Sequence, residues 1–154
     1  MTDLQVGVVD VFVLSGAGST LRVLALHRAE GTRCTGAWEV VHGRVEPGER
    51  PEEAAIREVG EETGLVVERL YNVTCQMFYL HRESTVQVAV VFAAFVTSLE
   101  PLALGVEHDE FDWWTVQEAS SRLSWPRSRA TLREAAALVG SGDAGAVEDV
   151  LRVM

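Results

Sequence analysis

Hydrophobic residues recur in short runs along this chain of 154 residues, and glycine, proline and polar side chains mark turns between the runs. Runs rich in valine, leucine and aromatic residues with such boundaries are typical of β-strands. The longest run, 86–96, is interrupted by Gln87 and is shorter than the roughly 18 apolar residues of a membrane span. The pattern predicts strands at 5–15, 21–27, 38–41, 85–96 and 111–115, with one or two more within 66–79.

Other segments carry the signals that begin and end helices. Pro51 suits the first turn of a helix, where a missing N–H costs nothing, and Gly64 suits a left-handed cap at its end. Thr115 and Glu118 have the spacing of a capping box, and Pro126 suits another helix start. Helices are therefore predicted from 51 to the cap at 64, from 115 onward, at 126–139 and at 144–153.

Composition narrows the classes of function. The formal net charge of −10 disfavours a general nucleic-acid groove, because nucleic acid is itself polyanionic. In residues 1–10 no basic region precedes an apolar one, so the pattern of a signal peptide is not expected. Cys34 and Cys75 are compatible with a disulfide, but without an export signal reduced thiols are favoured. A cytoplasmic protein without membrane association is expected, and its length suits one domain over residues 1–154.

Acidic side chains concentrate between positions 43 and 65, where GRVEPGERPEEAAIREVGEETGL contains seven glutamates. Glu58, Glu61 and Glu62 recur at i, i+3 and i+4, which places them on one face of a helix. Stacked like charges destabilise a helix unless they are neutralised, and a hard divalent cation prefers oxygen ligands of this kind. Ala55 and Val59 form an apolar stripe for docking on a sheet. Residues 43–50 are expected to form a loop because of their glycines and proline.

These 23 residues resemble the Nudix box, G-x5-E-x7-R-E-U-x-E-E-x-G-U, in which U is a bulky aliphatic residue. Its defined positions are filled by Gly43, Glu49, Arg57, Glu58, Val59, Glu61, Glu62, Gly64 and Leu65. The resemblance implies an α/β fold, specifically an α/β/α sandwich with a mixed central sheet. It also implies hydrolysis of a diphosphate linkage by attack of water on phosphorus, with Mg²⁺ as cofactor and Mn²⁺ as a substitute. The alternatives are an ordinary solvated acidic helix and a Nudix module that binds a nucleotide without cleaving it.

The resemblance assigns roles to individual residues. Glu58, Glu61 and Glu62 would be metal ligands together with the Gly43 carbonyl, and Glu107 would join them from a downstream loop. The catalytic base would be a box glutamate, Glu61 or Glu62, or else Glu107, which we favour over the exposed loop residue His108. Arg57 would orient Glu49 and its neighbours, and a phosphate contact is its alternative role. Family members are often dimers, which leaves a homodimer open.

The segment before the box departs from the usual W-x-x-P-G-G, because Val41 and His42 replace the Pro-Gly pair. His42 would lie at the lip of the phosphate site, where it either contacts a phosphate when protonated or has no role. Trp-x-x-V-x-G, Glu107-His108, Trp113 and Leu-Ser-Trp125 are similar to the dihydroneopterin triphosphate (or dATP) pyrophosphohydrolases.

That closer resemblance implies release of pyrophosphate from a pterin or deoxynucleoside triphosphate. Trp125 or Tyr79 would stack on the flat ring, and Arg28 would meet a terminal phosphate. The alternatives are core aromatic residues and an ordinary surface arginine, and Trp113 and Trp114 are expected in or near the core. Hydrolases of ADP-ribose, nucleotide sugars and dinucleoside polyphosphates fit less well. Leu80 stands where ADP-ribose hydrolases often have proline. Tyr79 is close to, but not at, the position where dinucleoside polyphosphate hydrolases tend to have tyrosine.

Overall fold

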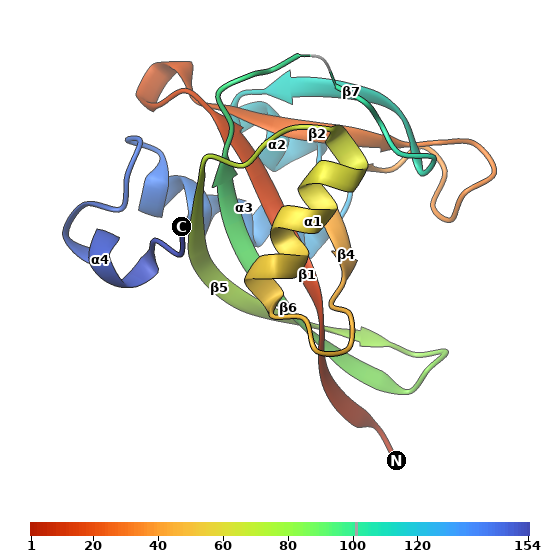
Figure 1. Ribbon diagram of the computed structural model, residues 1–154. Coiled ribbons are helices and arrows are strands. Elements are labelled where there is room, and N and C mark those ends of the chain that lie inside the picture. The colour runs from red at the N-terminus through yellow and green to blue at the C-terminus, as the bar shows by residue number, and fades with distance from the viewer. Residues whose placement is uncertain (101) are drawn as a thin grey trace.

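The computed structural model describes residues 1–100 and 102–154, and in it a β-sheet lies between helices on its two faces (Figure 1). The described residues form seven strands, β1 (Asp3–Ser15), β2 (Arg22–Arg28), β3 (Trp38–Glu39), β4 (Val41–Arg44), β5 (Arg69–Leu80), β6 (Thr85–Phe95) and β7 (His108–Trp114). The helices are α1 (Pro51–Thr63), α2 (Val116–Arg122), α3 (Pro126–Val139) and α4 (Glu148–Leu151), with 3-10 turns η1 (Gly18–Thr20) and η2 (Gly145–Val147).

Strand β1 organises the sheet. It runs parallel to β6 from the Asp3–Thr85 pair to the Leu14–Phe95 pair. Its other edge pairs first with β4 and then with β2, both antiparallel. The sheet order is β3-β2-β1-β6-β5, with β4 also on β1 and β7 on β2. The predicted α/β/α sandwich with a mixed sheet is confirmed, and β4 carries Gly43 to a position opposite Val9 in the middle of it.

Each face of the sheet has its own apolar core, because side chains alternate between faces along a strand. On one face Val9, Val11 and Val13 of β1 belong to the same core cluster as the predicted stripe of α1, including Ala55 and Val59. The other face packs against α2 and α3, and Trp114 at the end of β7 belongs to its core. Its largest buried side chains are Phe12, Leu14, Tyr71, Trp114, Leu123 and Leu132. Trp114 is thus a core residue, as predicted, and Trp113 is half-buried.

The predicted ends of α1 and α3 and the predicted start of α2 are confirmed, but several strand boundaries differ. Gly64 is left-handed with φ of 71°, and the Thr115 hydroxyl accepts from the Glu118 N–H. The predicted loop at 43–50 begins later, because Gly43 and Arg44 pair with β1. The predicted strand at 38–41 divides into β3 and the start of β4, which pair with β2 and β1 respectively.

Two predictions near the carboxyl end need correction. The expected irregular connection at 97–110 ends earlier, because β7 begins at His108 and pairs with β2; its position 101 lies outside the described residues. The expected helix at 144–153 is only η2 followed by the short α4. No helix in the described part of the chain is long and apolar enough to cross a membrane.

Candidate metal centre and substrate pocket

Arg57 of helix α1 forms hydrogen bonds with three glutamates, of which Glu58 and Glu61 lie on the same helix and Glu49 lies just before it. Its Nη1 donates to Glu58 Oε1 at 2.7 Å and to Glu61 Oε2 at 3.2 Å. Its Nε and Nη2 donate to the two carboxylate oxygens of Glu49 at 2.8 and 3.0 Å. Nη2 also donates to the Arg44 carbonyl at 2.9 Å, which ties the helix to the end of β4. Arg57 thus supplies one positive charge to three carboxylates and contacts Glu49, as the box pattern suggested.

Glu62 is buried, with 7% of its surface exposed, although glutamate side chains are usually exposed. Its Oε2 has no hydrogen-bond partner among the described residues. Burial, together with the nearby carboxylates of Glu58, Glu107 and Glu39, raises the pKa of Glu62 to about 9. A buried, unpaired carboxylate is costly, and a cation beside it would remove that cost.

Gly43 has no side chain where Glu58 needs room. A Cβ at position 43 would collide with the carboxyl group of Glu58, which therefore lies against bare backbone. Gly60 contrasts with Gly43, since a Cβ there would meet no atom within 4 Å. The close approach of Glu58 is thus a physical reason for glycine at position 43, and position 60 shows none.

The acidic side chains form two groups around this point. Glu58 and Glu62 are largely buried, while Glu61 and Glu107 are exposed at the rim. Glu107 lies on the turn before β7, and its Oε2 is 3.7 Å from Arg28 Nη1. The unpaired Glu62 oxygen, the Glu58 carboxylate held against Gly43 and an all-oxygen donor set together fit a hard cation such as Mg²⁺ or Mn²⁺.

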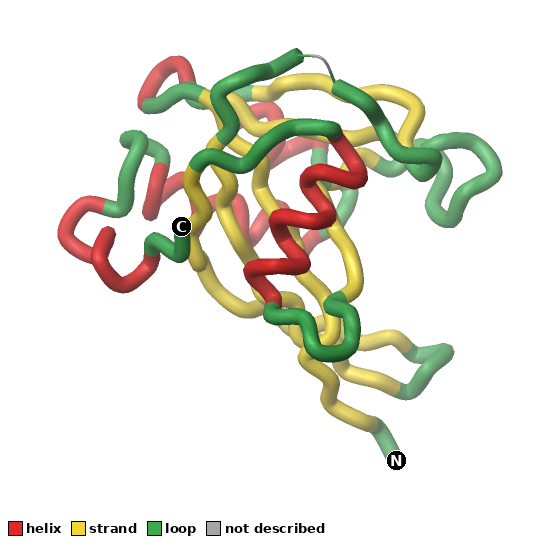
Figure 2. The backbone as a smooth tube through the Cα atoms, in the orientation of Figure 1, coloured by secondary structure: helices red, strands yellow, loops and turns green. Residues whose placement is uncertain are grey.

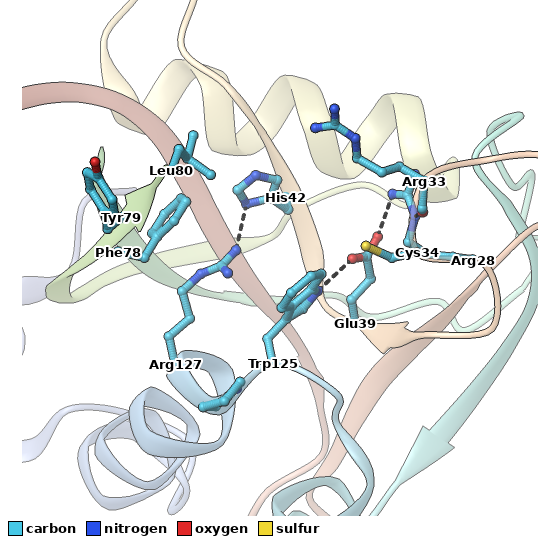
Figure 3. A pocket seen from close by; sticks show the side chains of 11 residues that line it. Arg28, Arg33, Cys34, Glu39, His42, Phe78, Tyr79, Leu80, Trp125 and Arg127 are labelled. Carbon is cyan, nitrogen blue, oxygen red and sulfur yellow. Dashed lines mark hydrogen bonds and ion pairs between the residues drawn. The ribbon is translucent and has the colours of Figure 1, made fainter. Parts of the chain in front are cut away.

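A cavity of about 520 Å³ lies beside the acidic group, and Figure 3 shows its side chains. One wall contains Trp125, which immediately precedes α3. Another is formed by the last residues of β5, Phe78, Tyr79 and Leu80. Four basic side chains also line the cavity, although the chain as a whole is strongly acidic: Arg28, Arg33, His42 and Arg127. The predicted substrate residues Arg28, His42, Trp125 and Tyr79 are therefore brought together in one cavity.

Glu39 connects the cavity to the acidic group, and sequence reasoning did not identify it. Its Oε1 accepts from Arg28 Nη1 and lies 2.9 Å from His108 Nε2, while its Oε2 accepts from Trp125 Nε1 at 3.0 Å. Burial alone would raise the pKa of Glu39, but these hydrogen bonds lower it to about 2. A charged residue inside the short β3 strand was the available signal, because buried charges are rarely tolerated without partners.

His108 is buried, with Nε2 on Glu39 and Nδ1 4.0 Å from Glu62 Oε2, so the expectation of an exposed loop histidine was wrong. It begins β7, whose pairing with β2 carries it inward beside the acidic group. Strand pairing thus places an imidazole between Glu39 and Glu62, where the sequence suggested solvent.

A second buried carboxylate, Asp10 of β1, holds the other side of the cavity. Its Oδ1 lies 2.6 Å from His42 Nδ1, and its Oδ2 accepts from Arg127 Nε at 3.0 Å. Burial would raise the pKa of Asp10, but these two partners lower it. The Arg127 guanidinium lies 4.3 Å from the centre of the Phe78 ring and 5.6 Å from that of Trp125. An aspartate within a valine-rich run was a sequence signal that Asp10 has a buried partner, whereas nothing in the sequence marked Arg127 as that partner.

Comparison with known proteins is consistent with this geometry. A family model described as NUDIX domain matches residues 4–135. An octanoyltransferase from Myxococcus xanthus is 36% identical over 84% of this chain, which spans only 36% of that protein. The asymmetrical bis(5'-nucleosyl)-tetraphosphatase of Mus musculus is 29% identical over 75% of this chain and 79% of its own.

Solved structures share the fold. An Ap4A hydrolase binary complex from C. elegans has a TM-score of 0.71 at 19% identity, covering 84% of this chain and 94% of its own. The dihydroneopterin triphosphate pyrophosphohydrolase of E. coli has a TM-score of 0.64 at 25% identity, covering 81% and 92%. Proteins with different substrates in their names therefore share this architecture, and the substrate is not fixed by the fold.

We expect Gly43→Ala to weaken cation binding, because the new Cβ displaces the Glu58 carboxylate. The measurement is the rise in thermal midpoint on adding Mg²⁺, which should be large for the unchanged protein and much smaller for the variant. Gly60→Ala is the matched control: it should keep the full rise and add up to about 1 kcal/mol of stability, since alanine favours a helix interior. Equal Mg²⁺-induced shifts in Gly43→Ala and Gly60→Ala would contradict the placement of the cation.

Proposed function

Because the chain belongs to the Nudix family, we propose that it is a Mg²⁺-dependent hydrolase that cleaves a diphosphate linkage in a small nucleoside or pterin triphosphate. Mn²⁺ is the expected substitute for Mg²⁺. The observation that carries the proposal is the buried carboxylate of Glu62, which has one oxygen without a hydrogen-bond partner among the described residues and lies beside other acids.

The proposal gives each residue a physical task. Glu58, Glu62 and the Gly43 carbonyl would hold the cation, with Glu61 and Glu107 completing the site at its rim. When bound, the cation neutralises phosphate charge, polarises phosphorus and lowers the pKa of bound water. Arg57 would hold the carboxylates of Glu49, Glu58 and Glu61 in position through the contacts described above.

Glu107 is our candidate for the general base. It is exposed and so can receive a proton from water, whereas Glu62 is buried. Arg28 lies 3.7 Å from its carboxylate and limits where the side chain can lie. The same arginine donates to Glu39, which in turn holds Trp125 in the cavity. Occupation of the cavity is thereby linked to the position of the base.

We expect Glu107→Gln to lower kcat by about 100-fold or more, within the usual contribution of a general base, because an amide accepts no proton at neutral pH. Steady-state kinetics at saturating Mg²⁺ gives the measurement. Glu110→Gln is the control, since Glu110 is an exposed acid three positions away, and its kcat should stay within twofold. A loss below about tenfold in Glu107→Gln would assign the base to a box glutamate instead.

The cavity suits a substrate with one flat ring. Its volume of about 520 Å³ lies in the range of small-molecule sites. Trp125 and Phe78 offer aromatic faces, and the Arg127 guanidinium lies near both. Dinucleoside polyphosphates are a second candidate, favoured by the 29% identity to the mouse tetraphosphatase over 79% of its length.

A substrate panel with Mg²⁺ tests the proposed reaction, with pyrophosphate and phosphate measured separately. It contains deoxynucleoside triphosphates, dihydroneopterin triphosphate, a dinucleoside polyphosphate, ADP-ribose and nucleotide sugars. Pyrophosphate from a triphosphate is the expected result. Turnover of only the dinucleotide, ADP-ribose or sugars would move the protein to one of those subclasses. No turnover with either Mg²⁺ or Mn²⁺ would refute the hydrolase proposal in favour of a binding module.

Replacing Trp125 by alanine should raise KM by about tenfold, because ring stacking contributes roughly 1–3 kcal/mol. Trp125→Phe separates the two roles of this side chain, since it keeps an aromatic face but removes the Nε1 donor to Glu39. We expect its KM to stay within about threefold of the unchanged protein, as judged on the best substrate of the panel. An unchanged KM in Trp125→Ala would show that no ring stacks there.

A further inference from the structure

One guanidinium in the cavity is held in a fixed orientation by a buried carboxylate. Asp10 lies between Val9 and Val11 on β1, so its side chain points to the face of the sheet on which α3 packs, opposite α1 (Figures 1 and 2). Arg127, in the first turn of α3, donates to both of its oxygens, from Nε at 3.0 Å and from Nη2 at 3.4 Å. The side chains of Asp10 and Arg127 are 2% and 15% exposed, and this pair therefore fixes where the guanidinium points.

The third nitrogen of this guanidinium is left for another partner. Nη1 of Arg127 forms no hydrogen bond with the described residues, and it carries two N–H donors. The guanidinium carbon lies 4.3 Å from the centre of the Phe78 ring and 5.6 Å from that of Trp125 (Figure 3). A flat substrate ring that stacks on either aromatic side chain would therefore have an edge within reach of Nη1.

The carboxylates around the cavity are already engaged as acceptors. Both oxygens of Glu39 accept from arginine, histidine or tryptophan donors, and both oxygens of Asp10 accept from Arg127, with His42 also on Oδ1. These partners keep the pKa of each carboxyl group below its usual value, so both groups are charged. An amino group on a substrate ring would have to displace a protein donor from one of them, and guanidinium donors form the stronger hydrogen bonds with a carboxylate.

Among the other polar side chains of the cavity, donors outnumber acceptors. Arg33 adds a further guanidinium, which has no lone pair to accept with. The Nδ1 of His42 lies 2.6 Å from Asp10, so Nε2 is its one remaining nitrogen. The Tyr79 hydroxyl can donate or accept and favours neither kind of ring. The cavity thus suits a ring edge made of acceptors better than one that carries an amino group.

We propose that Arg127 is the specificity-determining residue of the cavity and selects a ring that presents a carbonyl oxygen beside an unprotonated ring nitrogen. A 6-oxopurine and a 4-oxopteridine both have such an edge, whereas a 6-aminopurine would turn an N–H donor toward Nη1. Arginine pairing with the oxygen and nitrogen of an oxopurine edge is the commonest base-specific contact in DNA recognition. The inference rests on the proposed function, because it takes the cavity to be the ring site of the substrate. Within the substrates left open above, it favours an oxo ring over dATP.

Nucleosides without phosphate test this selection in the absence of any cation or turnover. Inosine and adenosine form a matched pair, because they carry an oxygen and an amino group, respectively, at the same position of the purine. We expect inosine to bind the unchanged protein at least about tenfold more tightly than adenosine, since a good arginine contact to a base edge discriminates by that much. Titration followed by NMR gives both dissociation constants. Equal affinity, tighter binding of adenosine, or no binding of either nucleoside would overturn the proposal.

Arg127→Lys separates the guanidinium from its charge. Lysine keeps a positive partner for Asp10, so the variant should fold, which circular dichroism checks, but it lacks the planar set of donors. We expect its preference for inosine to fall to within about threefold. Arg129→Lys is the matched control on the same helix, since Arg129 binds the carbonyls of Leu123 and Ser124 outside the cavity, and it should keep the full preference. A folded Arg127→Lys that also keeps the full preference would overturn the proposal.

Failure of this proposal and failure of the hydrolase proposal are seen in different measurements. A preference for inosine without turnover of any triphosphate would refute only the hydrolase proposal. If ITP and ATP were hydrolysed with equal kcat/KM, the hydrolase proposal would stand and the selection by Arg127 would be overturned.

Discussion

Helix α1 can bring its glutamates to the middle of the sheet because β4 has no side chain at Gly43. The Glu58 carboxylate fills the space that a Cβ would take, and Arg57 fixes the helix to the end of the same strand. Glu62 lies one helical turn after Glu58 on the same face of α1, so this contact also directs Glu62 inward. Ala55 and Val59, packed on the sheet below, hold the helix in that orientation. The acidic group thus follows from one close approach between a helix and bare backbone.

Three buried acids around the site are treated differently by their surroundings. Glu39 has arginine, histidine and tryptophan partners, and Asp10 has histidine and arginine, so both are held charged. Glu62 has carboxylates as neighbours instead and keeps one oxygen unpaired. The fold therefore supplies hydrogen-bond partners to Glu39 and Asp10, which shape the cavity, and leaves an oxygen of Glu62, which faces the other glutamates, without one. This contrast is the physical argument for a cation at Glu62 and against a purely structural acidic helix.

The sequence predicted those features that depend on local pattern. The caps of α1, its apolar stripe and the bounds of α3 follow from residues close together in the chain, and the structure shows all three. His108 was expected in an exposed loop and the burial of Glu62 was not expected, because both depend on how α1 and β7 dock on distant strands. Asp10 and Glu39 sat visibly within strand patterns, yet their partners Arg127 and Trp125 lie over 80 positions away.

The central claim is that Glu62 is kept buried for a cation, and direct ion binding tests it without any substrate. Mn²⁺ can be titrated into the metal-free protein while free ion is followed by electron paramagnetic resonance. The account predicts saturable binding to the unchanged protein and binding at least about tenfold weaker in Glu62→Gln, since one charged oxygen ligand is lost. Equal Mn²⁺ affinity in the two proteins would contradict the account and leave Glu62 as an acid without a cation.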